Sequence, residues 1–495
     1  MIETMVGGVA TLDYNGDGLL DIYFTNGSVT PSMKKEGPRF YNRLYRNDGG
    51  MKFTDVSEAA GVTGEGYSMG VAVADYDNDG DTDIFVAGVY HNILFRNNGD
   101  GTFTEVTSKA GIHSDLWSVA AGWVDYDRDG WLDLFVVNYV EWDLNWKKFC
   151  GDPTGNIRVY CHPKHFVGLP NTLYRNRGDG TFENVTEKAG ILDYVGRGMS
   201  VAFEDFDDDG WIDIFVTNDK LPNFLFRNLG DGTFEENALL AGVALREHGR
   251  AISSMGAAVR DYDNDLLPDI WVTALDWETF PLFHNEGEGY FEDATYPTGV
   301  AKATIKRSAW SLGMFDFNND GWKDLFTANA HANHRIDLWE STDYRQVNTI
   351  LMNSRGTFSD VAAEVGEDFQ VPRAHRGSAC GDLNNDGKID IVVTSIGDET
   401  ELWENISPDS NWIIFKLRGT KSNRDGIGTR IHIPGQSNVM TTSVGYASSS
   451  YTGVHFGLGQ TSRLDKVEII WPSGIRQVLT DVEANRVVTV VEPGS

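Results

Sequence analysis

The residues of this sequence that are best suited to chemistry are carboxylates, and they recur in a fixed nine-residue pattern. Seven copies of Asp-x-(Asp or Asn)-x-Asp-(usually Gly)-x-x-Asp begin at Asp13, Asp75, Asp125, Asp205, Asp261, Asp316 and Asp382. Oxygen-bearing side chains at positions one, three, five and nine, with a Gly at position six that permits a sharp turn, place several oxygens around one point. Ca²⁺ takes six to eight such ligands at about 2.3 to 2.6 Å. Each copy, called an acidic loop below, is therefore predicted to bind one calcium ion.

We expect each acidic loop to use four side chains, together with the carbonyl oxygen of position seven, which is Asp81 in the second loop. The expected side-chain ligands are Asp13, Asn15, Asp17 and Asp21; Asp75, Asp77, Asp79 and Asp83; Asp125, Asp127, Asp129 and Asp133; Asp205, Asp207, Asp209 and Asp213; Asp261, Asp263, Asp265 and Asp269; Asp316, Asn318, Asp320 and Asp324; and Asp382, Asn384, Asp386 and Asp390. A solvated turn without an ion is the alternative, but carboxylates packed into one tight loop would repel one another strongly. Mg²⁺ would prefer fewer protein oxygens, and no Cys or His is placed for zinc.

The fifth acidic loop departs from the pattern. Leu266 replaces the Gly of position six, and Pro268 precedes the final Asp269. Because all four acidic positions persist, we expect a site with altered geometry there. About seven ions, one in each repeat, would couple folding to calcium. We therefore interpret the ions as structural rather than catalytic.

Strands must position these loops, because each loop lies between short apolar runs rich in Val, Ile and Phe, as in MGVAVADYDNDGDTDIFVAG around Asp75. A second pattern, such as LFRNNGDGTFTEV from Leu94, alternates with the first. Its central Asn and Gly favour a tight turn, so each copy predicts a β-hairpin. Each repeat of about 50 to 60 residues therefore supplies about four strands, which is typical of a propeller blade.

These units predict an all-β fold, with a seven-bladed β-propeller at residues 1–408 and a small β-rich domain at residues 409–495. A linear solenoid is the alternative, but it would need capping repeats that the sequence does not show. The seventh repeat reaches Trp403 without a final strand, and the first opens directly on MVGGVATLD. Either a segment upstream of this chain is missing or one blade has only three strands. We favour the missing segment, which would also explain why no export signal is visible at Met1.

At this point the residues resemble a known family. The alternation of acidic loops with hairpins of the type LYRNRGDGTF is similar to the FG-GAP/VCBS repeats of calcium-binding propellers. The C-terminal part contains KSNRDGIGTRI from Lys421, GYASSSY from Gly445, FGLG from Phe456 and WPSG from Trp471. These segments resemble the ASPIC/UnbV domain, which follows such repeats in the cartilage acidic protein family and its bacterial relatives. The resemblance implies a seven-bladed propeller joined to a compact β domain, usually secreted.

The charge of the chain excludes some partners. Its 495 residues include 41 Lys and Arg against 73 Asp and Glu, for a formal net charge of −32. Nucleic acid and anionic membranes are poor partners for so acidic a protein. No apolar run approaches the roughly 18 residues that a membrane helix needs. Because many of the acids occupy predicted ligand positions, the net charge itself identifies no macromolecular partner.

Two cysteines, Cys150 and Cys161, lie in the one long insertion, which falls in the third repeat. We predict a disulfide between them, which fits an oxidising compartment and so an extracellular or periplasmic location. A metal site formed with His162 and His165 is the alternative, although the spacing fits no common zinc pattern.

Two functions from different classes remain open. The favoured hypothesis is a non-catalytic extracellular binding or adhesion module that presents a propeller face to a protein or glycan. The alternative is a calcium-dependent enzyme of the cyclase or lyase type, acting on a small molecule in a pocket at the propeller face or the domain junction. No GxSxG, P-loop or dinucleotide motif is present, and His331, His334 and His375 are the candidate catalytic residues.

Overall fold

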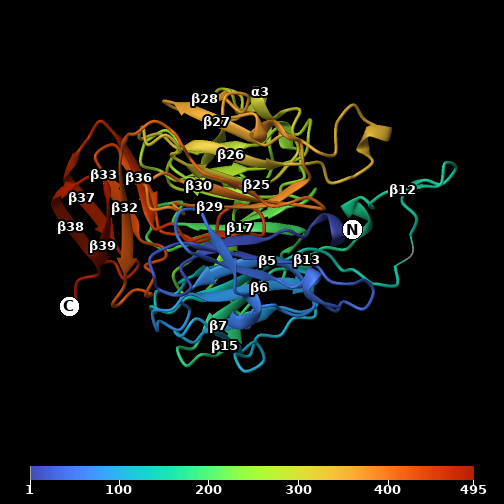
Figure 1. Cartoon of the computed structure of the whole chain (residues 1–495), viewed down its shortest axis with the longest axis horizontal. Helices are drawn as coiled ribbons and strands as arrows, with labels where there is room; N and C mark the ends of the chain where they lie inside the picture. Colours follow the sequence, from blue (N-terminus) through green and yellow to red (C-terminus); the bar gives the residue numbers. More distant parts are fainter. Residues whose placement is uncertain (1, 147, 495) are drawn as a thin grey trace.

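The computed structural model describes residues 2–146 and 148–494, and these residues form an all-β structure with only short helices (Figure 1). The α-helices are α1 (Ser57–Ala60), α2 (Ala238–Ala241) and α3 (Val300–Thr304). The 3₁₀ helices are η1 (Ile2–Thr4), η2 (Pro38–Phe40), η3 (Pro163–His165), η4 (Glu247–Gly249), η5 (Ile336–Leu338) and η6 (Asp368–Gln370). None of the helices in the described residues is both long and apolar enough to cross a membrane.

The repeats fold into successive antiparallel sheets, each built from strands that follow one another in the chain. The first three sheets contain β1 (Val9–Leu12), β2 (Asp21–Phe24), β3 (Arg43–Asn47) and β4 (Phe53–Asp55); β5 (Tyr67–Ala74), β6 (Asp83–Val89), β7 (Ile93–Asn97) and β8 (Phe103–Glu105); and β9 (Ser118–Val124), β10 (Asp133–Asn138), β14 (Thr172–Asn176) and β15 (Phe182–Asn184). The next three contain β17 (Gly198–Glu204), β18 (Asp213–Asn218), β19 (Phe224–Asn228) and β20 (Phe234–Glu236); β21 (Ala257–Arg260), β22 (Asp269–Val272), β23 (Leu282–Asn285) and β24 (Phe291–Asp293); and β25 (Ala309–Phe315), β26 (Asp324–Asn329), β27 (Thr349–Ser354) and β28 (Thr357–Asp360). In the part of the chain that the structure describes, the seventh repeat forms a three-stranded sheet of β29 (His375–Gly381), β30 (Asp390–Ser395) and β31 (Glu401–Trp403).

The first strands of these sheets lie next to one another in chain order. The strand β5 contacts β1 and β9, and the contacts continue through β17, β21 and β25 to β29, which in turn contacts β1. Every residue of β5 is buried, as is every residue of β9, because neighbouring sheets cover both faces of each inner strand. Apolar clusters fill the spaces between consecutive sheets; one of them joins Phe215 of the fourth sheet to Ile270 and Phe283 of the fifth.

The C-terminal residues form two further sheets at one end of the molecule (red in Figure 1). One contains β36 (Val454–Gly459), β32 (Asn411–Arg418) and β39 (Arg486–Val491), and the other contains β34 (Gln436–Val439), β33 (Arg430–Ile433), β37 (Arg463–Ile470) and β38 (Arg476–Glu483). The expectation of a β-rich C-terminal part is therefore confirmed, while the exact boundary at residue 409 stays a prediction.

A buried segment of this C-terminal part, residues 441–452, reaches in among the inner strands and is called the central loop. Its short strand β35 (Ser449–Ser450) pairs in parallel with β1. Val71 of β5 donates its N–H to the Ala447 carbonyl at 3.1 Å, and Gly445 donates to the Ala257 carbonyl of β21 at 3.0 Å. Further hydrogen bonds or close packing join the loop to the other inner strands at Val9, Gly122, Ser200, Ser311 and Cys380. The central loop thus contacts the first strand of all seven sheets.

The insertion in the third repeat lies at the end opposite the C-terminal sheets, where β12 is seen in Figure 1. It contains the hairpin of β11 (Gly151–Asp152) and β12 (Ile157–Arg158), and the short strand β13 (Leu169–Pro170) that ends it pairs with β16 (Val195–Gly196). Cys150 and Cys161 form a disulfide, so that prediction is confirmed. The alternative metal site, which needs two free thiolates, is therefore wrong.

Candidate metal centres in the acidic loops

Each acidic loop connects the first strand of its sheet to the second and is held by the same hydrogen bonds. In the second loop Gly80 donates its N–H to Asp75 Oδ2 at 2.7 Å, and Tyr76 donates to Asp83 Oδ2 at 3.2 Å. The N–H of Asp81 bonds Asp79 Oδ1 at 2.9 Å. Equivalents of these three hydrogen bonds occur in all seven loops. These backbone hydrogen bonds therefore hold the carboxylates of positions one, five and nine in place without an ion.

The fifth loop keeps this backbone although it lacks Gly. Leu266 has a φ of 78°, in the left-handed region that the glycines at position six occupy in the other loops. A non-glycine residue there costs on the order of 1 to 3 kcal/mol. One hydrogen bond differs, because Asp261 Oδ1 accepts from Asn264 N at 2.7 Å, whereas the same atom in loops such as the second accepts from position five. The fifth loop thus keeps the three shared hydrogen bonds and differs in the donor to Asp261 Oδ1, while its ligand geometry stays a prediction.

An asparagine near the end of the third strand of each sheet links the acidic loop to the neighbouring repeat, and it was not among the predicted site residues. Asn97 donates its backbone N–H to Asp83 Oδ1 at 2.7 Å, and its side-chain Nδ2 bonds the carbonyl of Tyr14 in the preceding repeat at 2.8 Å. The same pair of bonds recurs in all seven repeats. In the first repeat, Asn47 bonds the Leu383 carbonyl of the seventh at 2.8 Å. The signal was present, because this Asn recurs in every hairpin while its neighbours vary.

Four loops bring three or more carboxylates to within 4.8 Å of one another. The groups are Asp75, Asp77 and Asp83; Asp125, Asp127 and Asp133; Asp205, Asp207 and Asp209; and Asp261, Asp263 and Asp269. The first, sixth and seventh loops carry Asn at position three, and Asn15 Oδ1 and Asn318 Oδ1 each accept the N–H of position five. In these loops the predicted ligands therefore lie close together in a single tight turn.

The donor set fits a calcium ion. Among the described residues, the Oδ1 atoms of Asp77, Asp125, Asp127 and Asp263 are buried without a hydrogen-bond partner. A buried carboxylate oxygen without a partner is costly, so each of these atoms requires a cation or an equivalent partner. Oxygen donors gathered around one point are what Ca²⁺ binds.

Burial and mutual repulsion also raise the pKa values of these carboxyl groups. Burial, with a smaller contribution from Asp425, raises the pKa of Asp75 to about 8. Burial followed by the charges of Asp129 and Asp127 raises the pKa of Asp125 to about 7. A bound divalent cation would reverse both effects, because it favours the ionised form.

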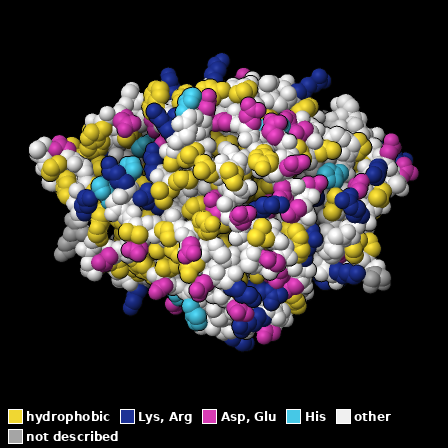
Figure 2. Space-filling model, turned by 180° about the vertical axis from the view of Figure 1, so that it is seen from behind, with side chains coloured by type: hydrophobic (Ala, Val, Ile, Leu, Met, Phe, Trp, Pro, Cys, Tyr) yellow, Lys and Arg dark blue, Asp and Glu magenta, His cyan; other side chains and the backbone are white. Residues whose placement is uncertain are grey.

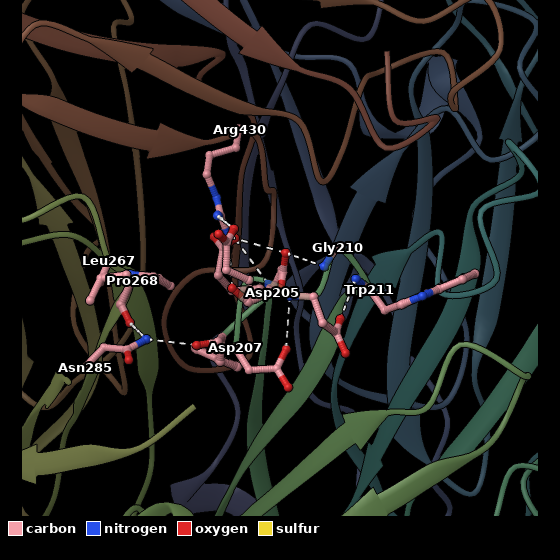
Figure 3. A network of polar contacts seen from close by, with 12 residues as sticks. Asp205, Asp207, Gly210, Trp211, Leu267, Pro268, Asn285 and Arg430 are labelled. Carbon is pink, nitrogen blue, oxygen red and sulfur yellow. Dashed lines mark hydrogen bonds and ion pairs between the residues drawn. The ribbon is translucent and has the colours of Figure 1, made fainter. Parts of the chain in front are cut away.

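The C-terminal part lies against the acidic loops, which the sequence did not reveal. Figure 3 shows Arg430 of β33 pointing into the fourth loop beside Asp205. Its guanidinium lies 2.9 Å from Glu204 Oε1 and 2.9 Å from Asp208 Oδ1, and it donates to the Asp205 carbonyl at 2.9 Å. In the second loop, Asp425 Oδ2 accepts the N–H of Asp75 at 2.8 Å. The loops are therefore both candidate metal sites and part of the interface with the C-terminal sheets.

A histidine beside the fifth loop corrects the expectation that no Cys or His is placed for zinc. His284 Nδ1 lies 3.2 Å from Asp269 Oδ1 and 3.4 Å from Asp263 Oδ2. The hydrogen bond to Asp269, with the charges of Asp269, Asp263 and Asp265, raises the pKa of His284 to about 9. The acidic-loop pattern alone does not reveal this residue, because His284 lies in the hairpin that faces the loop.

The three candidate catalytic histidines have different partners. His375 is buried, with Nδ1 2.9 Å from the Asn329 carbonyl and Nε2 2.9 Å from Glu401. His331 Nε2 lies 3.6 Å from Asp276 Oδ1, and the His334 ring packs edge-on against Tyr160.

A cavity of about 210 Å³ lies beside the insertion, lined by residues that include Tyr139, Tyr160, His162, Asp219 and Trp310. Tyr139 donates its hydroxyl to Asp219 Oδ2 at 2.7 Å, and burial raises the pKa of Asp219. Of the histidines in the described residues, only His162 lines this cavity.

Comparison with protein families identifies the repeats. The FG-GAP-like repeat matches residues 13–86, 75–136, 166–216, 205–272 and 261–327, which together make up more than half of the chain. The chain belongs to the FG-GAP-like repeat family. Residues 419–495 match the ASPIC and UnbV family, so the resemblance seen in the sequence is confirmed in both parts.

The chain is also similar, at low sequence identity, to cartilage acidic proteins of vertebrates. The chain is 24% identical over 341 residues to cartilage acidic protein 1 of Homo sapiens, covering 66% of this chain and 48% of that protein. It is 26% identical over 361 residues to the Xenopus tropicalis protein of the same name, covering 67% and 50%. The chain spans about half the length of the curated relatives it matches.

The solved structures to which this chain is similar match it with TM-scores below 0.5. An Agrocybe aegerita protein that recognises non-reducing terminal N-acetylglucosamine has a TM-score of 0.43 and 17% identity, covering 81% of this chain and 94% of that one. A Bacillus licheniformis rhamnogalacturonan lyase has a TM-score of 0.40 and 11% identity, with coverages of 90% and 80%. A Burkholderia pseudomallei lectin has a TM-score of 0.40 and 10% identity, with coverages of 97% and 99%.

Proposed function

We propose that this chain is a calcium-binding, seven-bladed propeller of residues 1–408 joined to an ASPIC/UnbV-like β domain of residues 409–495, and that it acts as a non-catalytic extracellular binding module. The observation that supports it most strongly is the acidic loop itself, repeated seven times with the same hydrogen bonds. In the second, third and fifth loops, buried carboxylate oxygens lack a partner among the described residues. The side chains at positions one, three, five and nine would hold the ion, which would supply the positive charge that these loops need.

Ring closure is supported by three contacts between the ends of the array. The strand β29 lies against β1, the Asn47 side chain bonds the Leu383 carbonyl, and the central loop touches both strands. A solenoid would leave its first and last repeats apart. Seven repeats joined in this cycle are therefore interpreted as seven blades, of which the last has three strands.

The distribution of charge on the surface is consistent with a module whose acidic loops bind metal ions. Figure 2 shows acidic, basic and apolar side chains intermixed over the visible face, without a large region of one sign. A disulfide in the insertion supports an oxidising compartment, and so an extracellular or periplasmic location. A surface on which charges of both signs are intermixed favours a protein or glycan ligand over nucleic acid.

A second candidate function, a calcium-dependent enzyme or small-molecule binder, is favoured by one observation. The cavity beside the insertion combines the Tyr139, Tyr160 and Trp310 rings with the Asp219 carboxyl group, whose pKa is raised by burial. Such a group in a cavity is a candidate general acid or base. Both ring nitrogens of His375 are occupied, one by the Asn329 carbonyl and the other by Glu401, which supports the non-catalytic proposal instead.

Thermal unfolding of the full chain tests the calcium proposal. Removing metal with a chelator should lower the melting temperature by many degrees, and millimolar Ca²⁺ should restore it where equal Mg²⁺ does not. Each site held at 1,000 times its dissociation constant contributes about 4 kcal/mol to the free energy of unfolding. Asp125→Asn should reduce the calcium-dependent shift, whereas Asp179→Asn, in an exposed hairpin turn, should leave it unchanged. Identical melting curves with and without calcium would contradict the proposal.

A further inference from the structure

The fifth acidic loop differs from the other six in the residue that faces it. In several hairpins, the residue before the bridging asparagine contacts its own acidic loop; Arg175 contacts Asp127 and Asp129, for example. In chain order this position is occupied by Arg46, Arg96, Arg175, Arg227, His284, Met352 and Glu404. A guanidinium cannot ligate a metal, whereas an imidazole nitrogen can. Only the fifth of these positions therefore offers a nitrogen ligand.

The side chain of His284 points between the carboxylates of its loop. Asp263, Asp265 and His284 each have a donor atom within 4.8 Å of the others, and the same holds for Asp261, Asp263 and Asp269. His284 Nδ1 lies 3.4 Å from Asp263 Oδ2 and 3.2 Å from Asp269 Oδ1. A tetrahedral zinc site with ligands at about 2.0 to 2.1 Å separates its donor atoms by about 3.3 Å. Both distances from His284 Nδ1 therefore match the edge of such a site.

The opposite nitrogen also has the environment of a metal-bound imidazole. His284 Nε2 lies 3.7 Å from Glu286 Oε1. A histidine that ligates a metal commonly directs its other ring nitrogen at a carboxylate, which fixes the ring and its tautomer. The His284 side chain is 23% exposed, so an ion can reach it from solvent.

The fifth loop also offers a donor that calcium does not favour. Ca²⁺ binds six to eight oxygens and gains nothing from an imidazole, whereas zinc and similar borderline ions favour mixed nitrogen and oxygen donors. His284 therefore adds to the four carboxylates of this loop a donor that suits zinc better than calcium.

We propose that the fifth loop is a zinc-class transition-metal site in which His284 Nδ1, Asp263 and Asp269 bind one Zn²⁺ and Asp265 supplies the fourth donor. The proposal rests on the proposed function only in assigning calcium to the other six loops. It adds a second metal chemistry to a molecule whose repeats otherwise offer oxygen donors alone.

Zinc titration of metal-stripped full-length protein tests this site. Millimolar Ca²⁺ is kept present throughout, so that the calcium loops do not compete for Zn²⁺, and binding is followed by competition with a chromophoric zinc chelator. We expect one tight Zn²⁺ per chain. We also expect Co²⁺ to give the visible absorption of a four-coordinate site. His284→Gln and His284→Arg, the second of which restores the residue of four other hairpins, should each weaken Zn²⁺ binding at least about 100-fold.

Controls separate this proposal from the calcium proposal. His248→Gln removes an imidazole that is 77% exposed on its side chain and lies outside the loops, and it should leave Zn²⁺ binding unchanged. Unaltered Zn²⁺ affinity in the His284 variants would overturn the proposal, as would an unmodified protein that binds no Zn²⁺ because a protonated His284 already neutralises the loop. Zinc binding that survives while the other loops bind no calcium would overturn the proposed function alone.

Discussion

Replacing Arg430 by Met should remove the ion pairs that join β33 of the C-terminal sheets to the fourth acidic loop. The Arg430 side chain is 13% exposed and bridges Glu204, which is 3% exposed, to Asp208, which is 80% exposed. Burial alone would lower the pKa of Arg430, but Glu204, Asp205 and Asp208 raise it above its ordinary value. The guanidinium is therefore the charge that balances a buried carboxylate.

The expected cost follows from this difference in burial. Removing one partner of a buried ion pair costs about 3 to 5 kcal/mol, because the other charge is left uncompensated. The exposed contact with Asp208 adds at most about 1 kcal/mol. We therefore expect Arg430→Met to lower the free energy of unfolding by about 3 to 5 kcal/mol in urea denaturation at saturating calcium.

Two companion variants make this measurement decisive. Glu204→Gln in the Arg430→Met background should recover part of the loss, since it removes the stranded charge. Arg476→Met breaks a pair with Glu468 in the same part of the chain, and the Arg476 side chain is 66% exposed, so it should cost less than about 1 kcal/mol. A loss for Arg430→Met no larger than that for Arg476→Met would refute the interpretation of Arg430 as a buried interface charge.

Three further predictions concern the repeats, the central loop and pH. Asn228→Ala removes the Nδ2 bonds to the Tyr126 and Ile212 carbonyls and should cost about 2 to 4 kcal/mol in urea denaturation, whereas Asn98→Ala, at an exposed turn, should cost about 0.5 kcal/mol; equal losses would contradict the bridging role. Tyr446→Phe removes the hydroxyl bond to the Met5 carbonyl and should cost about 1 to 2 kcal/mol, and Tyr446→Ala about 3 to 5 kcal/mol; a smaller effect for Ala than for Phe would refute tight packing of the central loop. In the metal-free protein, burial raises the pKa of Asp382 to about 6 and of Asp75 to about 8, so the folded form holds protons that the unfolded chain has released. Its stability should therefore fall as pH rises from about 5 to about 8, and metal-free denaturation curves that show a rise instead would contradict these shifts.

Local features of the fold could be predicted from the sequence. The acidic loop, the strands on either side of it and the following hairpin are each encoded within a few residues, so the loop from Asp75 to Asp83 lies between β5 and β6 as expected. The pairing of Cys150 with Cys161 was also accessible, because both lie in one short insertion.

Contacts between distant segments could not be predicted in this way. The central loop reaches seven strands that are far from it in the chain, and nothing in GYASSSY itself encodes that position. Arg430 meets Glu204 across 226 residues, and only the packed fold brings the two together. His284 lies closer in sequence, but its role depends on a hairpin folding back over the loop that precedes it.

The most direct test of the central claim is the number of calcium ions bound by the full chain. Metal-stripped protein is dialysed to equilibrium against Ca²⁺, and calcium and protein are quantified in the same sample. The seven acidic loops predict at least six calcium ions per chain, and one fewer in Asp125→Asn. A count of one or none in correctly folded protein would contradict the claim that these loops are metal centres.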